Sequence, residues 1–318
     1  MTIWNRIRGI EDPLAPLSAL VAGSGPEAER LAAALRAEPG VTVTAAAGEE
    51  ALAQIRRREV AMVEIALPAA QAQPLAEEAL RAGLFVSTVC PPTRAGLRGL
   101  SDLADQNHAT LRIRLNPFYY PPYREMKRLL DDDAVGRPVT LKMTVRRGKG
   151  TVLPAELSPA AWIAEHELGF LALAGWMVGT AEKAFGRLEP ILTNGTPASS
   201  LLAWKFAGRH QYGYLQLDFC PKLHVRTFTE PVHRALELTG LGGIIFATRG
   251  EGQLLRSPAL IVRGKSTTTA FEILPDDWRE VYPALAREAI AAVRSSAPVL
   301  ATADRALEAL KILELAGG

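Results

Sequence analysis

Two side chains of this sequence are best suited to proton transfer or nucleophilic chemistry, a histidine between two acids and one of the two cysteines. His166 lies between Glu165 and Glu167, and neighbouring carboxylates raise the basicity of an imidazole, so it is a candidate general base. Cys90 is a candidate nucleophile if a helix N-terminus or a base lowers the pKa of its thiol. Each also has a structural interpretation: the two acids as charges at a helix start, His166 as a hydrogen-bonding group, and Cys90 as a small buried hydrophobic residue.

Polar and aromatic residues follow an apolar stretch at residues 110–115. Asn116, Tyr120 and Tyr123 could bind a sugar or an aromatic ligand, because tyrosine rings stack on such molecules and their hydroxyls form hydrogen bonds. The neighbouring prolines favour an alternative in which the same rings stiffen an interdomain connection. Two cysteines and five scattered histidines give no usual zinc-ligand spacing, so no metal site is predicted.

Residues 23–28 could bind the phosphates of a nucleotide. They read Gly-Ser-Gly-Pro-Glu-Ala, which fits the pattern G-x-G-x-x-A directly after an apolar run at residues 17–22 and before a helical pattern. Gly23, Ser24, Gly25 and Ala28 are therefore candidate cofactor-binding residues. Glycine lets the backbone approach a pyrophosphate closely, and the helix N-terminus attracts its charge.

Two features around this turn oppose nucleotide binding. Glu27 and Glu29 place carboxylates in the first helical turn, where they suit the helix dipole but repel a bound anion. The second predicted strand ends in alanines, and Glu49 is the nearest acid that could hold the ribose hydroxyls. Glu49 could equally begin the next helix, so nucleotide binding stays open on this pattern alone.

Alternating strands and helices dominate the first part of the chain and predict a parallel sheet. The predicted strands cover residues 17–22, 41–46, 60–67, 85–88 and 110–115. After residue 120 the pattern changes to short strands separated by Gly and Pro turns, which predicts a mostly antiparallel open sheet. The fold class is therefore α/β, with a Rossmann-type domain followed by an α+β domain.

The predicted domains are a dinucleotide-binding domain at 1–120, a substrate and oligomerisation domain at 121–302, and a last helix at 303–318. Helices at 162–178 and 278–294 are expected to cover one face of the second sheet. The last helix is expected to pack back on the first domain. The open sheet needs covering, which predicts a homo-oligomer joined through that face.

The composition limits the classes of function that this chain can have. The chain has 318 residues, 36 basic and 34 acidic groups and a net charge of +2, so it resembles an ordinary globular protein with no sign of nucleic-acid binding. No apolar run approaches the roughly 20 residues that span a bilayer. Two cysteines give no disulfide framework, and a cytoplasmic location is expected.

The order and spacing of several motifs resemble the Gfo/Idh/MocA oxidoreductases. The motifs are the glycine turn, the strand ending at Pro68, the Ala82-Gly83 turn, the break at Pro91, the Val135-Gly136 segment and the Pro298-Val299-Leu300 segment before the last helix. The resemblance covers nearly the whole chain. It implies an NAD(P)-dependent oxidoreductase acting on a sugar or related alcohol, with Pro68 and Pro91 beside the cofactor as well as the glycine turn.

The sequence departs from this family where proton transfer is expected. The family's Glu-Lys-Pro falls on Val89-Cys90-Pro91, so Cys90 replaces the lysine. The pattern Asp-x-Gly-x-His-x-x-Asp falls on residues 167–174, where Leu171 and Ala174 replace the histidine and the later aspartate, and a further family histidine falls on Ala72. The resemblance is therefore to a divergent member.

These departures leave alternative functions. The first is an atypical NAD(P)-dependent oxidoreductase acting on a sugar or related small polar alcohol or carbonyl, in which Cys90, His166, Glu167 or a tyrosine replaces the lost groups. The second is a non-catalytic binding or partner subunit on the same scaffold, since all the family's proton-transfer groups are replaced. A non-redox lyase or hydrolase is a third, because fold does not dictate chemistry.

Overall fold

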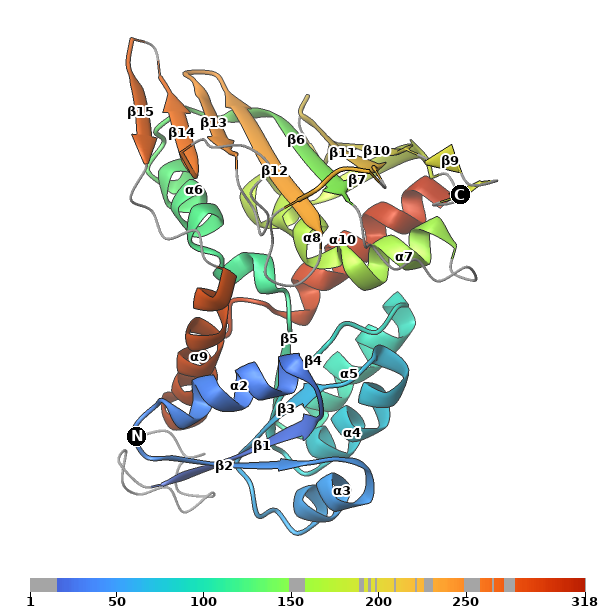
Figure 1. Cartoon of the computed structure of the whole chain (residues 1–318), viewed down its shortest axis with the longest axis vertical. Coiled ribbons are helices and arrows are strands. Elements are labelled where there is room, and N and C mark those ends of the chain that lie inside the picture. The colour runs from blue at the N-terminus through green and yellow to red at the C-terminus, as the bar shows by residue number, and fades with distance from the viewer. Residues whose placement is uncertain are drawn as a thin grey trace. The chain divides into compact units, whose positions relative to one another are not determined.

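The computed structural model describes residues 16–317 apart from 149–157, 189–191, 194–195, 198, 209, 221, 226–230, 249–257, 265 and 272–277. The chain divides into two compact units (Figure 1). The first contains residues 1–115 and 281–307, and the second contains residues 116–280 and 308–318. No helix of the described residues is long and apolar enough to cross a membrane.

A five-stranded sheet with the order β2-β1-β3-β4-β5 forms the centre of the first unit. Its strands are β1 (Leu17–Gly23), β2 (Val41–Ala46), β3 (Met62–Ala66), β4 (Phe85–Thr88) and β5 (Thr110–Ile113). Every pairing is parallel, which confirms the predicted Rossmann-type sheet. β3 and β4 are buried along their whole length, and this is why neither strand shows the polar and apolar alternation of a half-exposed strand.

Helices cover both faces of this sheet (Figure 1). They are α2 (Pro26–Arg36), α3 (Gly48–Arg56), α4 (Ala69–Arg81), α5 (Arg94–Gln106) and α9 (Val281–Ser295). The connection through α2 runs from β1 outward to β2, whereas α3, α4 and α5 lead back across the sheet in the opposite direction. Right-handed crossovers then place α2 on one face and the other three on the opposite face. The direction reverses between β1 and β3, and ligands of such sheets bind outside the strand ends at this point.

α9 corrects one prediction. The sequence pattern predicts that the helix at residues 278–294 covers the sheet of the second domain, but α9 packs against α2 and β4 of the first unit. Residues 281–302 thus belong to the first compact unit rather than to the second. An amphipathic pattern shows that a helix has an apolar face but does not show which surface that face covers.

The second unit contains an eight-stranded sheet with the order β15-β14-β13-β12-β6-β11-β10-β7. Its strands are β6 (Pro138–Arg147), β7 (Ala181–Arg187), β10 (Ser199–Phe206), β11 (Tyr212–Phe219), β12 (Val232–Gly240), β13 (Ile244–Ala247), β14 (Leu260–Arg263) and β15 (Thr268–Phe271). Only the pairing of β6 with β11 is parallel among the pairings in this sheet of the described chain. The prediction of a large, mostly antiparallel sheet is therefore confirmed. A separate hairpin pairs β8 (Leu192–Thr193) with β9 (Thr196–Pro197).

Short helices complete the second unit. They are η1 (Asn116–Tyr119), α6 (Pro121–Asp131), α7 (Pro159–His166), α8 (Leu168–Met177) and η2 (Trp278–Glu280), while α10 (Ala303–Gly317) begins in the first unit and ends in the second. α8 is apolar around most of its circumference, which is typical of a helix in a core. Within this unit α6, α7 and α8 lie on one side of the large sheet (Figure 1).

Candidate functional site

The glycine turn begins with a close approach of two strands. Gly23 ends β1 with a φ of +136°, and it pairs with Ala66 at the end of β3. A Cβ atom at this position would lie 2.3 Å from the carbonyl oxygen of Ala66. Only glycine therefore allows β1 and β3 to meet at the point where the sheet changes direction.

The second glycine leaves the N-terminus of α2 open. Gly25 is the N-cap residue with φ 89° and ψ −175°, and no side chain forms a capping hydrogen bond there. A Cβ on Gly25 would meet no atom within 4 Å, Ser24 is exposed, and Ala28 is buried under the helix. Uncapped N–H groups and the positive end of the helix dipole suit an anion, so this turn fits the diphosphate of a dinucleotide.

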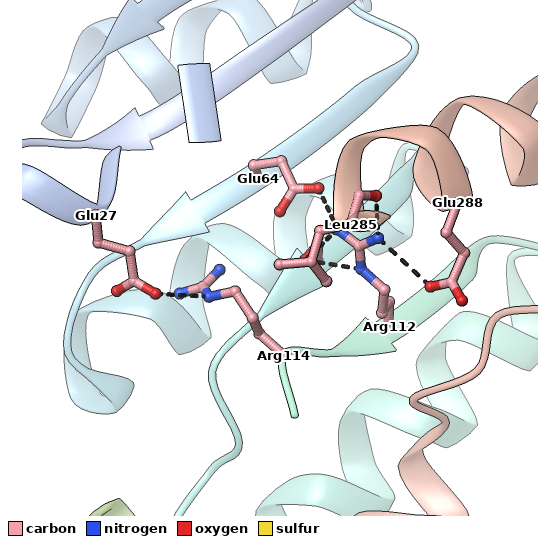
Figure 2. A network of polar contacts seen from close by, with 7 residues as sticks. Glu27, Glu64, Arg112, Arg114, Leu285 and Glu288 are labelled. Atoms are coloured by element: carbon pink, nitrogen blue, oxygen red, sulfur yellow. Dashed lines mark hydrogen bonds and ion pairs between the residues drawn. The ribbon is translucent and has the colours of Figure 1, made fainter. Parts of the chain in front are cut away.

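An ion pair lies beside this turn. The Nε atom of Arg114, just beyond β5, donates to Oε1 of Glu27 in the first turn of α2 at 3.0 Å (Figure 2). The Arg114 side chain is 1% exposed and that of Glu27 is 41% exposed. The carboxylate that would oppose a bound anion is thus partnered by a cation.

A second buried arginine ties α9 to the sheet (Figure 2). Glu64, Ser87 and Arg112 are in register across β3, β4 and β5, and the Arg112 guanidinium donates to the Glu64 carboxylate and to Oγ of Ser87 at 3.1 and 3.2 Å. It also donates to the carbonyl oxygen of Leu285 in α9 at 2.6 Å. Arg112 thereby joins three strands of the sheet to the helix.

The sequence contains a signal for these charges that motif matching misses. Arg112 and Arg114 are two residues apart in the predicted strand 110–115, which predicts that they project from the same face, and Glu64 is the one acid in the apolar run 60–67. A buried charge requires a partner. One acid and one arginine in separate core strands therefore suggest an ion pair.

The other predicted cofactor residues follow neighbouring strands. Pro68 lies just after β3 and is the exposed N-cap residue of α4, while Pro91 is buried after β4. Because all five strands are parallel, their carboxyl ends share one edge of the sheet. The structure thus places Pro68 and Pro91 on the same edge as the glycine turn.

Cys90 provides neither a cation nor a thiolate. Burial raises the pKa of its thiol to about 12, and the thiol donates to the carbonyl oxygen of Pro91 at 3.2 Å. The group is therefore a neutral thiol at physiological pH. This environment matches the inert interpretation of Cys90 better than the nucleophilic one.

Alkylation tests this directly. At pH 8, iodoacetamide is expected to modify Cys90 of the folded protein more than about a hundredfold more slowly than in the urea-unfolded chain, because the thiolate is the reacting form. Mass spectrometry of the peptide that contains Cys90 measures the rate. Equal rates in the folded and unfolded chains would contradict the burial-raised pKa.

Glu167 is held in a buried ion-pair network. It is 0% exposed, and its carboxylate accepts from Arg147 at 2.6 and 3.1 Å and from Arg234 at 2.7 and 3.1 Å. Burial alone would raise the pKa of this carboxyl, but the charges and hydrogen bonds of Arg234 and Arg147 outweigh it and lower the pKa. Glu167 therefore stays ionised and paired, which suits a structural role rather than proton transfer.

His166 ends α7 and is half-buried. Its imidazole packs on the Trp162 ring with the ring centroids 4.8 Å apart. His166 and Glu167 are thus adjacent but differ in environment, because only Glu167 is enclosed by arginines. Among the described residues no cluster of three or more His, Cys, Asp or Glu side chains could hold a metal ion.

The predicted substrate-binding tyrosines form an aromatic cluster. Tyr120 and Tyr123 are each 2% exposed, with ring centroids 5.3 Å apart, and Tyr123 also packs against Phe170 of α8. Asn116 begins η1 and is half-buried. Within the second unit these rings therefore pack α6 against α8.

The positions that depart from the family pattern are packed apolar sites. Leu171 and Ala174 in α8 are each 0% exposed, and Ala72 in α4 is 1% exposed. Polar groups there would need hydrogen-bond partners. Leu171, Ala174 and Ala72 therefore contribute to the apolar cores of their units.

No protein-family model and no curated protein sequence matches this chain. Solved structures do match over almost its whole length. An oxidoreductase from Agrobacterium radiobacter in complex with NAD+, L-tartaric acid and magnesium has a TM-score of 0.77 at 14% identity, with 95% of this chain and 96% of that chain covered.

Two further structures are similar. Biliverdin reductase from Synechocystis sp. PCC 6803, in complex with biliverdin and NADP+, has a TM-score of 0.72 at 15% identity and covers 96% of this chain and 100% of its own. GenD2 from gentamicin A biosynthesis, in complex with NAD, has a TM-score of 0.71 at 20% identity. The match covers 96% of this chain and 95% of GenD2. The chain thus has the fold of these oxidoreductases, and the resemblance to the Gfo/Idh/MocA type is confirmed at the level of fold.

Proposed function

We propose that this protein is an atypical NAD(P)-dependent oxidoreductase that acts on a sugar or a related small polar alcohol or carbonyl compound. The observation that carries the proposal is the uncapped N-terminus of α2 behind Gly25, at the switch point of a Rossmann-type sheet. The similar structures with bound NAD or NADP support it. A bound nicotinamide dinucleotide would supply or accept the hydride, while Gly23, Ser24 and Gly25 would hold its diphosphate.

NAD is proposed in preference to NADP. The carboxyl end of β2 leads to Gly48, and Glu49 and Glu50 are exposed in the first turn of α3. A carboxylate at this place can accept hydrogen bonds from the ribose hydroxyls of NAD, whereas it repels the 2′-phosphate of NADP. Residues 41–50 contain no basic side chain to balance that phosphate.

His166 is proposed as the proton-transfer residue. Cys90 stays protonated and Glu167 is enclosed by two guanidinium groups, whereas His166 is half-buried and an imidazole can both accept and donate a proton. An alternative, non-catalytic binding function is favoured by the apolar packing at Ala72, Leu171 and Ala174. Dinucleotide binding with turnover that is lost in His166→Gln supports the enzyme, and binding without turnover supports the alternative.

The cofactor proposal makes a prediction about Gly25. Its φ and ψ fall in a region that is almost restricted to glycine, so Gly25→Ala is expected to cost about 1–3 kcal/mol of stability and to weaken NADH binding at least tenfold. Calorimetric titration and the NADH-induced rise in melting temperature measure the effect. Gly99→Ala is the control, because a Cβ there also meets no atom within 4 Å but lies in α5. Wild-type protein that binds neither NADH nor NADPH would contradict the proposed function.

A homo-oligomer is proposed through the open face of the large sheet. Phe185, Leu201 and Tyr212, on β7, β10 and β11, are 66%, 47% and 51% exposed. Large apolar side chains on an open sheet are typical of an interface. Light scattering after size-exclusion chromatography should give more than one chain per particle, and Phe185→Glu with Leu201→Glu should reduce the mass to that of a monomer. A monomeric wild type would contradict it.

A cytoplasmic location is also proposed. Cys90 and Cys220 are both free and half-buried. Unpaired thiols are usual in a reducing compartment.

A further inference from the structure

Arg114 has a charge that its protein partners only half satisfy. Its Nε atom pairs with Glu27, but Nη1 and Nη2 are buried and have no hydrogen-bond partner in the described part of the chain. Buried guanidinium N–H groups without acceptors are costly, and such a group in a native protein usually faces a water, an ion or a ligand. The two nitrogens form one edge of a planar group that suits two phosphate oxygens.

The ion pair with Glu27 brings the Arg114 guanidinium to the first turn of the helix that follows the glycine turn. Arg114 follows β5, on the far side of β3 and β4 from β1, and its guanidinium reaches Glu27 in the first turn of α2 (Figure 2). Gly25 caps that helix without any side-chain cap. An anion at the N-terminus of α2 would therefore meet backbone N–H groups and a guanidinium together.

The ion pair of Glu27 with Arg114 makes the acidic first turn of α2 compatible with a bound anion. Its carboxylate engages Nε and leaves both terminal nitrogens of Arg114 unbonded, so it orients the guanidinium without using the edge that suits phosphate. Glu27 also remains 41% exposed, so the pair reaches the surface at this turn. In the same cluster Arg30 hydrogen bonds with Tyr282 of α9.

We propose that Arg114 binds the diphosphate of the dinucleotide through Nη1 and Nη2, with Glu27 as its positioning residue. The proposal rests on the dinucleotide-binding function proposed above. It assigns the positive charge of the site to a side chain at the end of β5, in addition to the backbone of the glycine turn.

Calorimetric titration of the full chain with NADH, ADP and adenosine tests this. Arg114→Gln is expected to weaken NADH and ADP binding by about tenfold to a hundredfold, because hydrogen bonds to a charged group are lost. Adenosine binding should change less than about twofold, since adenosine has no phosphate, and higher salt should reduce the difference between wild type and variant. Arg36→Gln is the control, because it removes the same charge from the exposed C-terminal turn of α2.

A double variant separates direct phosphate binding from neutralisation of Glu27. If Arg114 contacts the diphosphate, Glu27→Gln with Arg114→Gln stays well below wild-type affinity, although the loss of the Glu27 charge recovers part of what Arg114→Gln loses. If Arg114 only offsets the Glu27 charge, the double variant regains wild-type affinity and the proposal is wrong. Arg114→Lys keeps a cation and should retain partial affinity, which covers the case in which Arg114→Gln does not fold.

Two further outcomes separate this proposal from the proposed function. If NADH affinity is unchanged in both Arg114→Gln and Arg114→Lys, the proposed role of Arg114 is wrong. The proposed dinucleotide-binding function is not affected by that result. A wild type that binds neither NADH nor ADP overturns both.

Discussion

Replacing Arg112 with Met is expected to lower the free energy of unfolding of the first unit by about 3–5 kcal/mol, the usual effect of removing one member of a buried ion pair. Arg112 is 0% exposed and Glu64 is 1% exposed. Without the guanidinium, the Glu64 carboxylate would be left charged in the interior, where its Oε2 already lacks a hydrogen-bond partner among the described residues. The variant is therefore expected to lose far more unfolding free energy than the loss of side-chain packing alone would cause.

The effect should extend to α9. Arg112 donates to the carbonyl oxygen of Leu285, and Glu288, 3.5 Å from Arg112, accepts from the backbone N–H of Leu300 at 2.8 Å. These bonds attach the helix and the segment after it to β5. Loss of Arg112 should therefore loosen residues 281–300 together with β3, β4 and β5.

Hydrogen exchange measured by mass spectrometry is the appropriate measurement, because it resolves the two units. Four of the five tryptophans belong to the second unit, namely Trp162, Trp176, Trp204 and Trp278, so tryptophan fluorescence would report mainly on that unit. Peptides from β3 to β5 and from α9 should exchange faster in Arg112→Met, while peptides from the large sheet should not change.

A double variant provides the control. Arg112→Met with Glu64→Leu removes both charges and should recover most of the lost stability, since apolar residues of similar volume often replace buried ion pairs without loss. A single variant that loses less than about 1 kcal/mol would contradict the structural role of the pair. So would a double variant with the summed loss of the two single variants.

The sequence predicts the first sheet well because each strand there has strong local signals. Apolar runs ended by Gly23, Pro68 and Pro91 define the strand ends, and helical spacing defines the connections. The glycine turn is predicted for the same reason, since Gly23 is required by a contact between strands that are also recognised by pattern. Local signals cannot position α9, whose partner surface lies about 170 residues earlier in the chain, as in the Arg112 bond to Leu285.

The candidate catalytic residues show the limit of motif reasoning. Glu167 and His166 are neighbours in sequence, but the chemistry of Glu167 is decided by Arg147 and Arg234, which come from β6 and β12. Sequence spacing does not reveal that these strands are adjacent in the sheet. The buried state of Cys90 is likewise a property of packing and not of the Val89-Cys90-Pro91 motif.

Replacing Glu167 with Gln is expected to destabilise the second unit by about 3–5 kcal/mol at pH 7, because two buried guanidinium groups lose their shared carboxylate. The Arg147 guanidinium also lies over the Trp162 ring, with its carbon 4.6 Å from the ring centroid. Urea denaturation followed by tryptophan fluorescence therefore reports on this network. Glu165→Gln is the matched control, since Glu165 is exposed and adjacent in sequence.

The dependence of stability on pH gives a second, independent test of the network. The pKa of Glu167 in the folded chain is lower than its ordinary value of 4.5, so the folded state releases this proton more readily than the unfolded state. The ion pairs therefore contribute their full stability above pH 4.5, and that contribution is lost as the pH falls through the folded-state pKa. The difference in unfolding free energy between wild type and Glu167→Gln should be constant from pH 6 to 7 and should shrink below pH 4.5. A difference that does not change on acidification would mean that Glu167 is not ionised in the folded protein, and the assignment of a buried carboxylate held by two arginines would then be wrong.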